Sequence, residues 1–334
     1  MTIRQILQVI PQFRDYVWGG SRLRPGIVPT AEAWVVYEYN RVASGVLSEQ
    51  TLYDLAVEYG EALLGEWVVK RTGTRFPLLI KLLDCAQWLS LQVHPNDEQA
   101  IELEGPGQFG KTEAWHILEA EPGAQVIGGL QPGTKADVMA DAIRNGRILD
   151  LARYVDVRAG DTIFMPPGTI HALGPGLLIY EVQQTSDLTY RVWDWGRPQT
   201  AGRTLHIDKS LAVTNPASAV HVRPMPKVID GELVTLTRCP YFTLEMMLAE
   251  KKGILQKTRG ESFHALTVIE GNVDIQTNID GLRIGKYETV IIPACVGEYS
   301  ISSLGEARLL KASVEAQNGR VPSSDLPTLI ESIS

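Results

Sequence analysis

Apolar and polar residues alternate along many short stretches of this 334-residue chain, which is the period of a β-strand. The clearest of these stretches, separated by Gly, Pro and Asn, are residues 112–118, 161–165, 177–183, 265–275 and 287–292. Two stretches have helical spacing instead, near 48–64 with Ser48 as the expected cap and near 134–155 with Thr134 as the cap. Many short strands with frequent turn signals predict a mainly β protein, a sandwich or barrel with a few helices in its N-terminal half.

A change in composition divides the chain into two parts. Residues 216–227 contain three prolines and little periodicity, which is typical of a domain boundary. We therefore predict a domain over 1–220, which holds both helical segments, and a second all-β domain over 221–334. GDTIFMPPGTIHAL from Gly160 and GKYETVIIPACVGEYSI from Gly285 each show a strand that runs into Pro and then a Gly turn. This faint repeat suggests two copies of one β-fold.

One strand carries an unusual polar row. In LSLQVHPND, residues 89–97, period two places three apolar side chains on one face and Ser90, Gln92 and His94 on the other, before Pro95 ends the strand. Residues 160–171 then follow the pattern G-x-x-x-x-x-P-x-G-x-x-H, with His171 at the start of a returning strand. The pattern resembles the second signature motif of the cupins, jelly-roll barrels that hold a metal inside. We therefore expect two cupin-type jelly-roll β-barrels.

A carboxylate completes the expected metal site. In GKTEAWHIL, residues 110–118, period two puts Lys111 and Glu113 on one face and His116 on the other, so that Glu113 can point into the barrel beside Lys111. The predicted ligands offer mixed nitrogen and oxygen donors, which suit one zinc ion per chain. They are Gln92, His94, Glu113 and His171.

A narrower resemblance rests on motifs that follow one another in order. They are YVWGG from Tyr16, SLQVHP from Ser90, GKTE from Gly110, PPGTIHAL from Pro166 and EVQQTSDLTYRVWDW from Glu181. Together they resemble the class I mannose-6-phosphate isomerases, most of all the shorter bacterial form, over roughly residues 1–215. The C-terminal third is less similar, mainly in PYFTLE and VIEGNVDI.

The resemblance implies a zinc-dependent isomerase that interconverts mannose 6-phosphate and fructose 6-phosphate through an enediolate. It places the four zinc ligands on the residues named above. It places the catalytic residues on Arg191, Lys111, Lys81 and Asp187, and we expect Ser90, Trp18 and Glu181 to bind substrate. Such a reaction needs a Lewis acid and a group that moves a proton between C1 and C2. We favour Lys111 for the proton, with Lys81 as the other candidate.

Other histidines have a simpler interpretation. An isolated histidine in a β protein is more often a hydrogen-bonded structural residue than a ligand, and we interpret His116, His221 and His264 in this way, leaving His206 open. The second half of the chain has PACVGEY where the first has PPGTIHAL, so we expect a metal-free C-terminal barrel. Trp193 is expected in the core or the wall of a pocket, where Arg191 could stack on it.

Composition excludes several classes of partner. The chain has 31 Lys and Arg against 39 Asp and Glu, a net charge of −8 without a basic tract, which argues against nucleic acid and anionic membranes. The N-terminal residues lack a secretory pattern, and three cysteines without a C-x-x-C pair predict reduced thiols. We expect a cytoplasmic monomer or weak homodimer whose partner is a small sugar phosphate.

Three other functions stay open from sequence. A sugar-phosphate-binding cupin without catalysis is disfavoured by the intact Arg191 and Lys111. A cupin oxygenase is disfavoured because Gln92 stands where those enzymes have a histidine, and because Glu113 lies far downstream. An isomerase of a related aldose phosphate fits the same residues.

Overall fold

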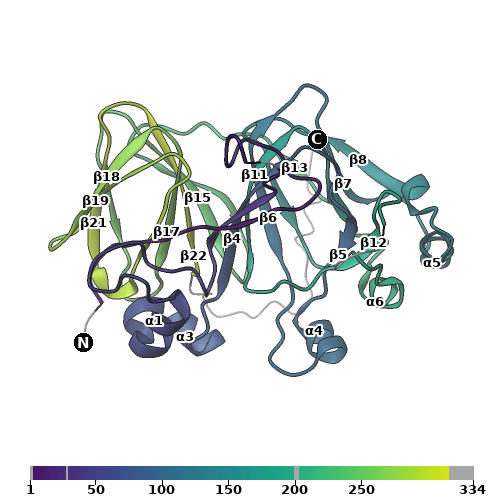
Figure 1. Ribbon diagram of the computed structural model, residues 1–334, viewed down its shortest axis with the longest axis horizontal. Helices are drawn as coiled ribbons and strands as arrows, with labels where there is room; N and C mark the ends of the chain where they lie inside the picture. The colour runs from purple at the N-terminus through teal and green to yellow at the C-terminus, as the bar shows by residue number, and fades with distance from the viewer. Residues whose placement is uncertain (1–2, 28, 199–202, 316–334) are drawn as a thin grey trace, which may run out of the picture.

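Figure 1 shows the computed structural model of the chain, which describes residues 3–27, 29–198 and 203–315. Most strands up to residue 223 lie toward the right of the molecule, and the strands from residue 233 onward, green to yellow, lie toward the left. The described strand pairs are antiparallel. The prediction of a mainly β protein is confirmed.

Two sheets form what we call the N-terminal unit. The seven-stranded sheet has the order β13 (Val222–Arg223), β9 (Thr162–Met165), β6 (Glu113–Ala120), β11 (Leu177–Gln184), β4 (Leu78–Cys85), β3 (Glu32–Val36) and β2 (Gln12–Arg14). The five-stranded sheet has the order β12 (Tyr190–Trp193), β5 (Leu91–Val93), β10 (His171–Leu173), β7 (Gln125–Leu130) and β8 (Ala152–Asp156).

Two further sheets form the C-terminal unit. The six-stranded sheet has the order β1 (Leu7–Gln8), β20 (Thr289–Ile292), β17 (His264–Glu270), β22 (Ala307–Ser313), β15 (Thr243–Ala249) and β14 (Leu233–Arg238). The four-stranded sheet has the order β16 (Ile254–Lys257), β21 (Glu298–Ser302), β18 (Asn272–Gln276) and β19 (Gly281–Gly285). Because β1 comes from the start of the chain and β13 from beyond residue 220, each unit borrows a short strand. The division at residue 220 stays a prediction.

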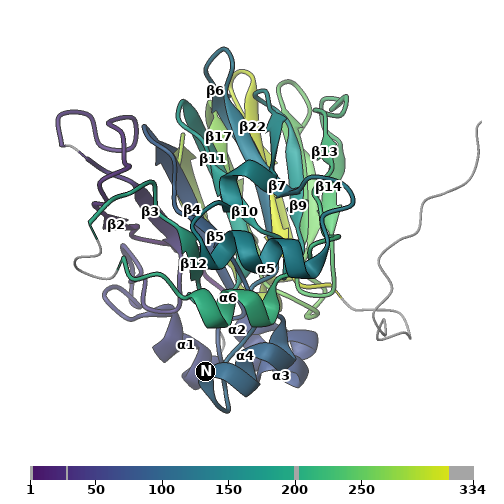
Figure 2. The same ribbon diagram turned by 90° about the vertical axis from the view of Figure 1, so that its right-hand side faces the viewer.

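The helices cover the sheets. They are α1 (Leu52–Tyr59), α2 (Glu61–Leu64), α3 (Glu66–Thr72), α4 (Asp97–Glu104), α5 (Ala136–Arg144) and α6 (Ile207–Val213), with 3-10 turns at Ile148–Leu151 and Ala294–Val296. Figure 2 shows α5 and α6 in front of the five-stranded sheet, where Met139 and Val213 join Leu91 and Val93 in one apolar cluster. Among the described residues, no helix has the length and apolarity needed to cross a membrane.

Period-two alternation decides which side chains face the site. On β4, Leu78, Ile80 and Leu82 enter the core between the two units, while Leu83 enters the interior of the N-terminal unit. Lys81 shares the face of Leu83, and so it points into that interior. The same rule puts Glu113 on β6 and Glu181 on β11 on the interior face.

Both predicted helical segments differ from the structure at their ends. Thr51, not Ser48, caps the first helix, because Thr51 and Asp54 form a reciprocal capping box. In the second segment, Lys135 rather than Thr134 is the N-cap, and the α-helix ends at Arg144. The following Gly146 has φ +66°, and residues 152–156 pair with β7 as a strand. Strand pairing with a distant segment therefore overrides the helical pattern there.

Candidate functional site

The polar row predicted on β5 lies at the centre of a strand trio. Gln92 is directly opposite His171 of β10 on one side and Arg191 of β12 on the other. His94 follows the end of β5, and its backbone carbonyl accepts a hydrogen bond of 2.8 Å from the N–H of Gly168. Gly168 has φ +79° in the turn that leads into His171, a conformation suited to glycine. The turn thus fixes both histidines relative to each other.

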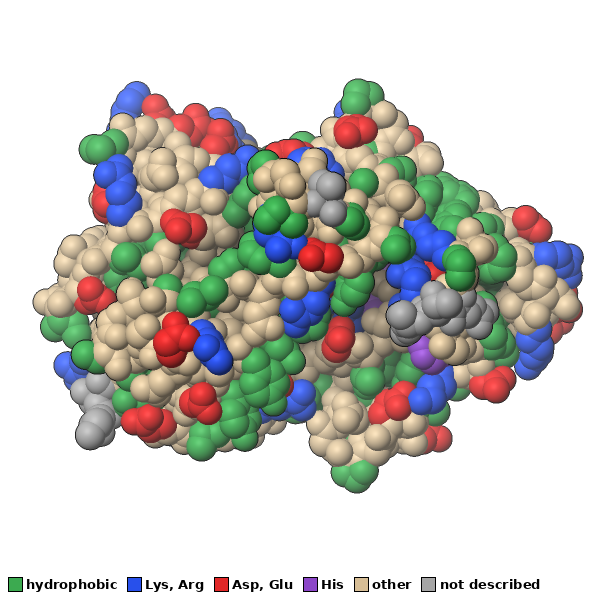
Figure 3. All heavy atoms as spheres, in the orientation of Figure 1, with side chains coloured by type: hydrophobic (Ala, Val, Ile, Leu, Met, Phe, Trp, Pro, Cys, Tyr) green, Lys and Arg blue, Asp and Glu red, His purple; other side chains and the backbone are tan. Residues whose placement is uncertain are grey.

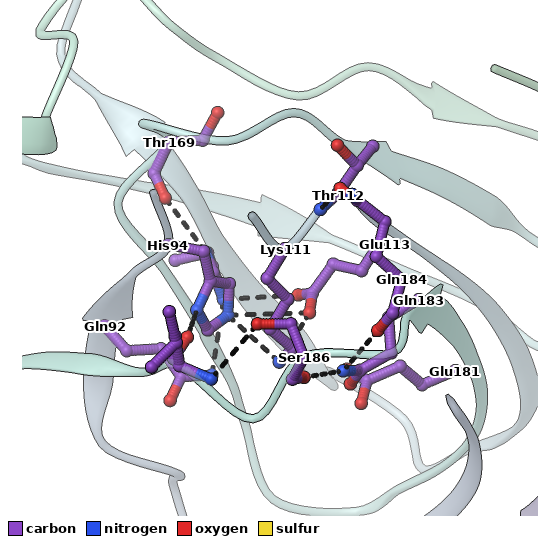
Figure 4. Close-up of polar contacts among 12 residues, drawn as sticks. Gln92, His94, Lys111, Thr112, Glu113, Thr169, Glu181, Gln183, Gln184 and Ser186 are labelled. Carbon is purple, nitrogen blue, oxygen red and sulfur yellow. Dashed lines mark hydrogen bonds and ion pairs between the residues drawn. The ribbon is translucent and has the colours of Figure 1, made fainter. Parts of the chain in front are cut away.

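The facing sheet supplies the carboxylate. Figure 4 shows Gln92, His94, Lys111 and Glu113 converging on one point. Glu113 Oε2 lies 3.5 Å from His94 Nε2, and Glu113 Oε1 lies 3.3 Å from His171 Nε2. The candidate ligand atoms of these three buried residues all lie within 4.8 Å of one another. The Gln92 amide nitrogen is 3.3 Å from His171 Nε2, and a half-turn of this amide would present its oxygen instead.

Hydrogen bonds to backbone carbonyls orient both histidine rings. His94 Nδ1 lies 2.8 Å from the carbonyl oxygen of Leu188, and His171 Nδ1 lies 2.9 Å from that of Thr169. Each ring can donate its Nδ1 hydrogen to a carbonyl, which leaves the Nε2 lone pair toward Glu113. Burial lowers the pKa of His171 to about 4. Burial, followed by the charge of Lys111, holds the pKa of His94 well below its usual range. Both rings are therefore uncharged at neutral pH.

Glu113 lacks the hydrogen bonds that a buried carboxylate ordinarily has. Its side chain is fully buried, and neither oxygen accepts a well-aligned hydrogen bond from the described residues. Burial raises the pKa of this carboxyl to about 7. Its basic neighbour is Lys111, whose Nζ lies 2.8 Å from Oε2 and 3.1 Å from His94 Nε2. Two lone-pair nitrogens and an under-bonded carboxylate fit a bound cation, and this donor set suits zinc.

Lys81 lies between the carboxylates of Glu32 and Glu181. Its Nζ is 3.4 Å from Glu181 Oε2 and 3.8 Å from Glu32 Oε2. Burial alone would lower the pKa of this ammonium, but the charges of Glu32 and Glu181 outweigh burial and raise it above its ordinary value. Lys81 is therefore a fixed cation, which disfavours its candidacy as the neutral base.

A cavity of about 600 Å³ opens above these groups. Eight of the predicted residues line it: Trp18, Lys81, Ser90, Gln92, Lys111, Glu181, Asp187 and Arg191. The other three, His94, Glu113 and His171, are buried next to it. The structure therefore brings all eleven predicted residues together, and their roles stay predictions.

Other lining residues were not among the predicted site residues. They include Asp15, Tyr16, Glu32, Trp115, Arg203 and His206. Tyr16 belongs to the quoted YVWGG motif, but Glu32 and Arg203 lie outside every quoted motif and had no sequence signal. His206, left open above, accepts a 3.1 Å hydrogen bond at Nδ1 from the backbone N–H of Arg191. It therefore helps to hold β12 at the rim of the cavity.

Two of the three histidines that we interpreted as structural, His116 and His264, lie away from the candidate ligand residues. His116 Nδ1 is 3.0 Å from Thr162 Oγ1 on the face of β6 opposite to Glu113. His264 Nδ1 is 2.7 Å from the hydroxyl of Tyr299 in the C-terminal unit. Asp194 is paired with Arg197 and Arg203, and so it anchors the loop after β12. On the face shown in Figure 3, acidic and basic side chains are interspersed.

Comparison with known proteins gives a consistent result. Residues 6–108 match the family model of the phosphomannose isomerase type I catalytic domain. The chain is 33% identical to mannose-6-phosphate isomerase ManA of Bacillus subtilis over 309 residues, 89% of this chain and 95% of that protein. It is also 33% identical to mannose-6-phosphate isomerase of Streptococcus mutans over 295 residues, 84% and 90% of the two chains.

Solved structures agree with these relatives. The mannose 6-phosphate isomerase from Bacillus subtilis superposes with a TM-score of 0.79 at 29% identity, covering 92% of this chain and 99% of that chain. A mutant of phosphomannose isomerase from Salmonella typhimurium superposes with a TM-score of 0.75 at 18% identity, covering 93% and 100%. The second match shows a shared fold.

Proposed function

The chain is an enzyme of the mannose-6-phosphate isomerase family, and on this premise we propose that it interconverts mannose 6-phosphate and fructose 6-phosphate with one zinc ion per chain. The observation that carries the proposal is the buried group of two neutral imidazoles and an under-bonded carboxylate beneath a polar cavity. The sugar phosphate as substrate belongs to the same proposal. The cytoplasmic location and the monomeric or weakly dimeric state stay predictions.

The ligand group supports zinc by its chemistry. His94 and His171 would bind through Nε2 and Glu113 through a carboxylate oxygen, with the Gln92 amide as the fourth donor. When bound, zinc would supply a Lewis acid that polarises the sugar's carbonyl group. Leu188 and Thr169 hold the two rings by their Nδ1 atoms, so the ligands are oriented before any ion arrives.

The proton transfer falls to a basic side chain beside the ligand group. Aldose–ketose isomerisation removes a proton from C2 and returns it to C1 through an enediolate, or the reverse. Lys111 is buried, lines the cavity and has its Nζ within 3.1 Å of atoms of His94 and Glu113. We assign the transfer to the nitrogen of Lys111. Lys81 keeps its own proton because of Glu32 and Glu181, and it contributes a permanent positive charge.

The cavity wall contributes charge and orientation. Arg191 is in register with Gln92 on the neighbouring strand and lines the cavity, and in this proposal its guanidinium stabilises the negative charge of the enediolate. Ser90 offers a hydroxyl for the phosphate or a sugar hydroxyl. Trp18 offers an apolar surface for the sugar, and Glu181 and Asp187 offer acceptors for its hydroxyl groups.

Isotope transfer tests the proposed reaction. Mannose 6-phosphate labelled with deuterium at C2 is incubated with the purified chain, and product is analysed by NMR. We expect fructose 6-phosphate that carries part of the deuterium at C1, with the remainder exchanged into solvent. Mannose 6-phosphate recovered unconverted, with its deuterium still at C2, would refute the proposed isomerisation. Transfer of all the deuterium to C1 without any exchange into solvent would indicate a hydride shift and contradict the proton transfer.

A further inference from the structure

The C-terminal unit encloses a second buried polar group between its two sheets. Its interior is apolar at Met247, Leu266 and Leu309, which lie on three neighbouring strands of the six-stranded sheet. Two residues further toward one end of each of these strands, the side chains on the same interior face are Glu245, His264 and Lys311. The polar group therefore lies at one end of an otherwise apolar interior, with Lys311 directly opposite Leu266 and Glu245.

Contacts join this layer across the two sheets. Glu245 of β15 and Lys311 of β22 are directly opposite each other, and Lys311 Nζ lies 2.7 Å from Glu245 Oε2. Lys311 Nζ also donates to Gln256 Oε1 of the four-stranded sheet at 3.3 Å. His264 Nδ1 lies 2.7 Å from the hydroxyl of Tyr299 in β21. The group is thus built by both sheets, as the N-terminal ligand group is.

A cavity of about 600 Å³ opens onto these residues. Lys311 and His264 line it, each 7% exposed. Three buried hydroxyl-bearing residues line it as well: Thr258, Ser262 and Ser313. The volume equals that of the cavity in the N-terminal unit and is ample for a small molecule. Buried hydrogen-bonding groups therefore form part of its lining, beside exposed charged side chains and the apolar Leu255 and Val314.

Stability does not account for the buried ion pair. The side chains of Lys311 and Glu245 are 8% and 5% exposed, and such a pair is often replaceable by apolar residues without loss. Among the described residues, Glu245 Oε2 has no well-aligned hydrogen bond beside its ion pair with Lys311, and the buried Thr243 Oγ1 has no partner. The N-terminal cavity has a similar buried ion pair, because Lys81 and Glu181 are also directly opposite each other on neighbouring strands. A lysine–glutamate pair thus faces the interior in both units.

Charges around the C-terminal cavity balance. Four cationic side chains line the cavity or form an ion pair with a residue that lines it: Arg238, Lys257, Arg259 and Lys311. Four carboxylates do the same: Glu245, Glu261, Glu298 and Glu315. A balanced set of donors and acceptors favours a ligand with many hydroxyl groups and no net charge. We propose that this cavity is a second binding site, for a neutral polyhydroxylated molecule of monosaccharide size, whatever the N-terminal cavity catalyses.

Histidine NMR tests the site directly. The full chain contains six histidines, and isotope labelling of this residue type gives one signal for each. The signal missing from a His264→Asn variant is assigned to His264. D-mannose is then added to the wild type, with inorganic phosphate and mannose 6-phosphate as separate probes. We expect mannose to shift the His264 signal saturably, with a Kd on the order of millimolar, and phosphate to leave it unchanged.

Variants locate the binding. Lys311→Met combined with Glu245→Gln removes the pair without leaving an unpaired buried charge, and we expect at least a tenfold weaker response of His264. If the double variant does not fold, Ser313→Val is used in its place, because the valine side chain fills part of the cavity. Lys251→Met, a lysine exposed on the surface of the same unit, is the matched control and should respond as wild type. The proposal is overturned by an unmoved His264 signal in mannose, by an equal response in the folded variants, or by a response to phosphate alone.

Discussion

Replacing Lys81 with methionine tests whether this lysine is a fixed cation. The Lys81, Glu32 and Glu181 side chains are at most 10% exposed. Methionine keeps the length of the side chain but leaves two buried carboxylates without their cation, which costs about 3–5 kcal/mol. A chain of 334 residues has an unfolding entropy of roughly 0.7 kcal/mol/K at about 2.1 cal/mol/K per residue, so the Tm should fall by about 4–7 °C.

The effect should depend on pH in a defined direction. The pKa of Lys81 is raised in the folded protein, so its stabilisation is complete below about pH 10.5, the unfolded value, and is lost above it. The charge of Lys81 helps to lower the pKa of the Glu181 carboxyl in the wild type, so this carboxyl binds a proton more readily in the variant. The loss of Tm should therefore be smaller at pH 5 than at pH 8.

Calorimetry at both pH values measures the effect, together with kcat. Lys81→Met with Glu181→Gln should recover part of the Tm, because one unpaired carboxylate is gone. Lys70→Met is the matched control, since Lys70 is 59% exposed and paired on the surface, and its Tm should stay within about 1 °C. An unchanged Tm at pH 8, or a normal kcat in Lys81→Met, would refute the reasoning.

Three further variants address single roles. Arg191→Ala should fold and keep its metal while kcat falls roughly a hundredfold or more. Arg191→Lys should recover little of this loss. A near-normal kcat with a raised KM in steady-state assays would show that Arg191 only holds the phosphate. Lys111→Met should keep the metal and slow isomerisation and C2 exchange together, and unimpaired exchange by NMR would move the base elsewhere. Burial lowers the pKa of His116 to about 4, so the wild type should lose up to about 3 kcal/mol of stability as pH falls from about 6.5 to 4. His116→Gln should flatten that slope in denaturation experiments without loss of metal, and an unchanged slope would contradict this account.

Local alternation was enough to predict the faces of several strands. The period of two placed Gln92 with His94, and Glu113 with Lys111, on shared faces, because side-chain direction along a strand is set by neighbouring residues. The partners of each strand are not local. Glu113 and Glu181 lie on neighbouring strands because β6 pairs with β11, which is more than sixty residues away in the sequence. From the sequence, this proximity could be predicted only through the ordered motifs of the family resemblance.

Some features depend on contacts that no local pattern encodes. Glu32 lies far from every quoted motif, yet it holds Lys81 in its charged form. The sequence therefore left Lys81 open as a base, and the structure disfavours that role. The second helical segment shows the same limit, since residues 152–156 form a strand through pairing with β7.

Metal content measured together with turnover tests the central claim most directly. Purified wild-type chain and His171→Ala are analysed for zinc by mass spectrometry and assayed with mannose 6-phosphate before and after chelation. The account predicts about one zinc per wild-type chain, loss of activity on chelation and its return with added zinc. For His171→Ala it predicts well under one equivalent and no turnover. A fully active metal-free wild type, or a fully metallated and active His171→Ala, would contradict it.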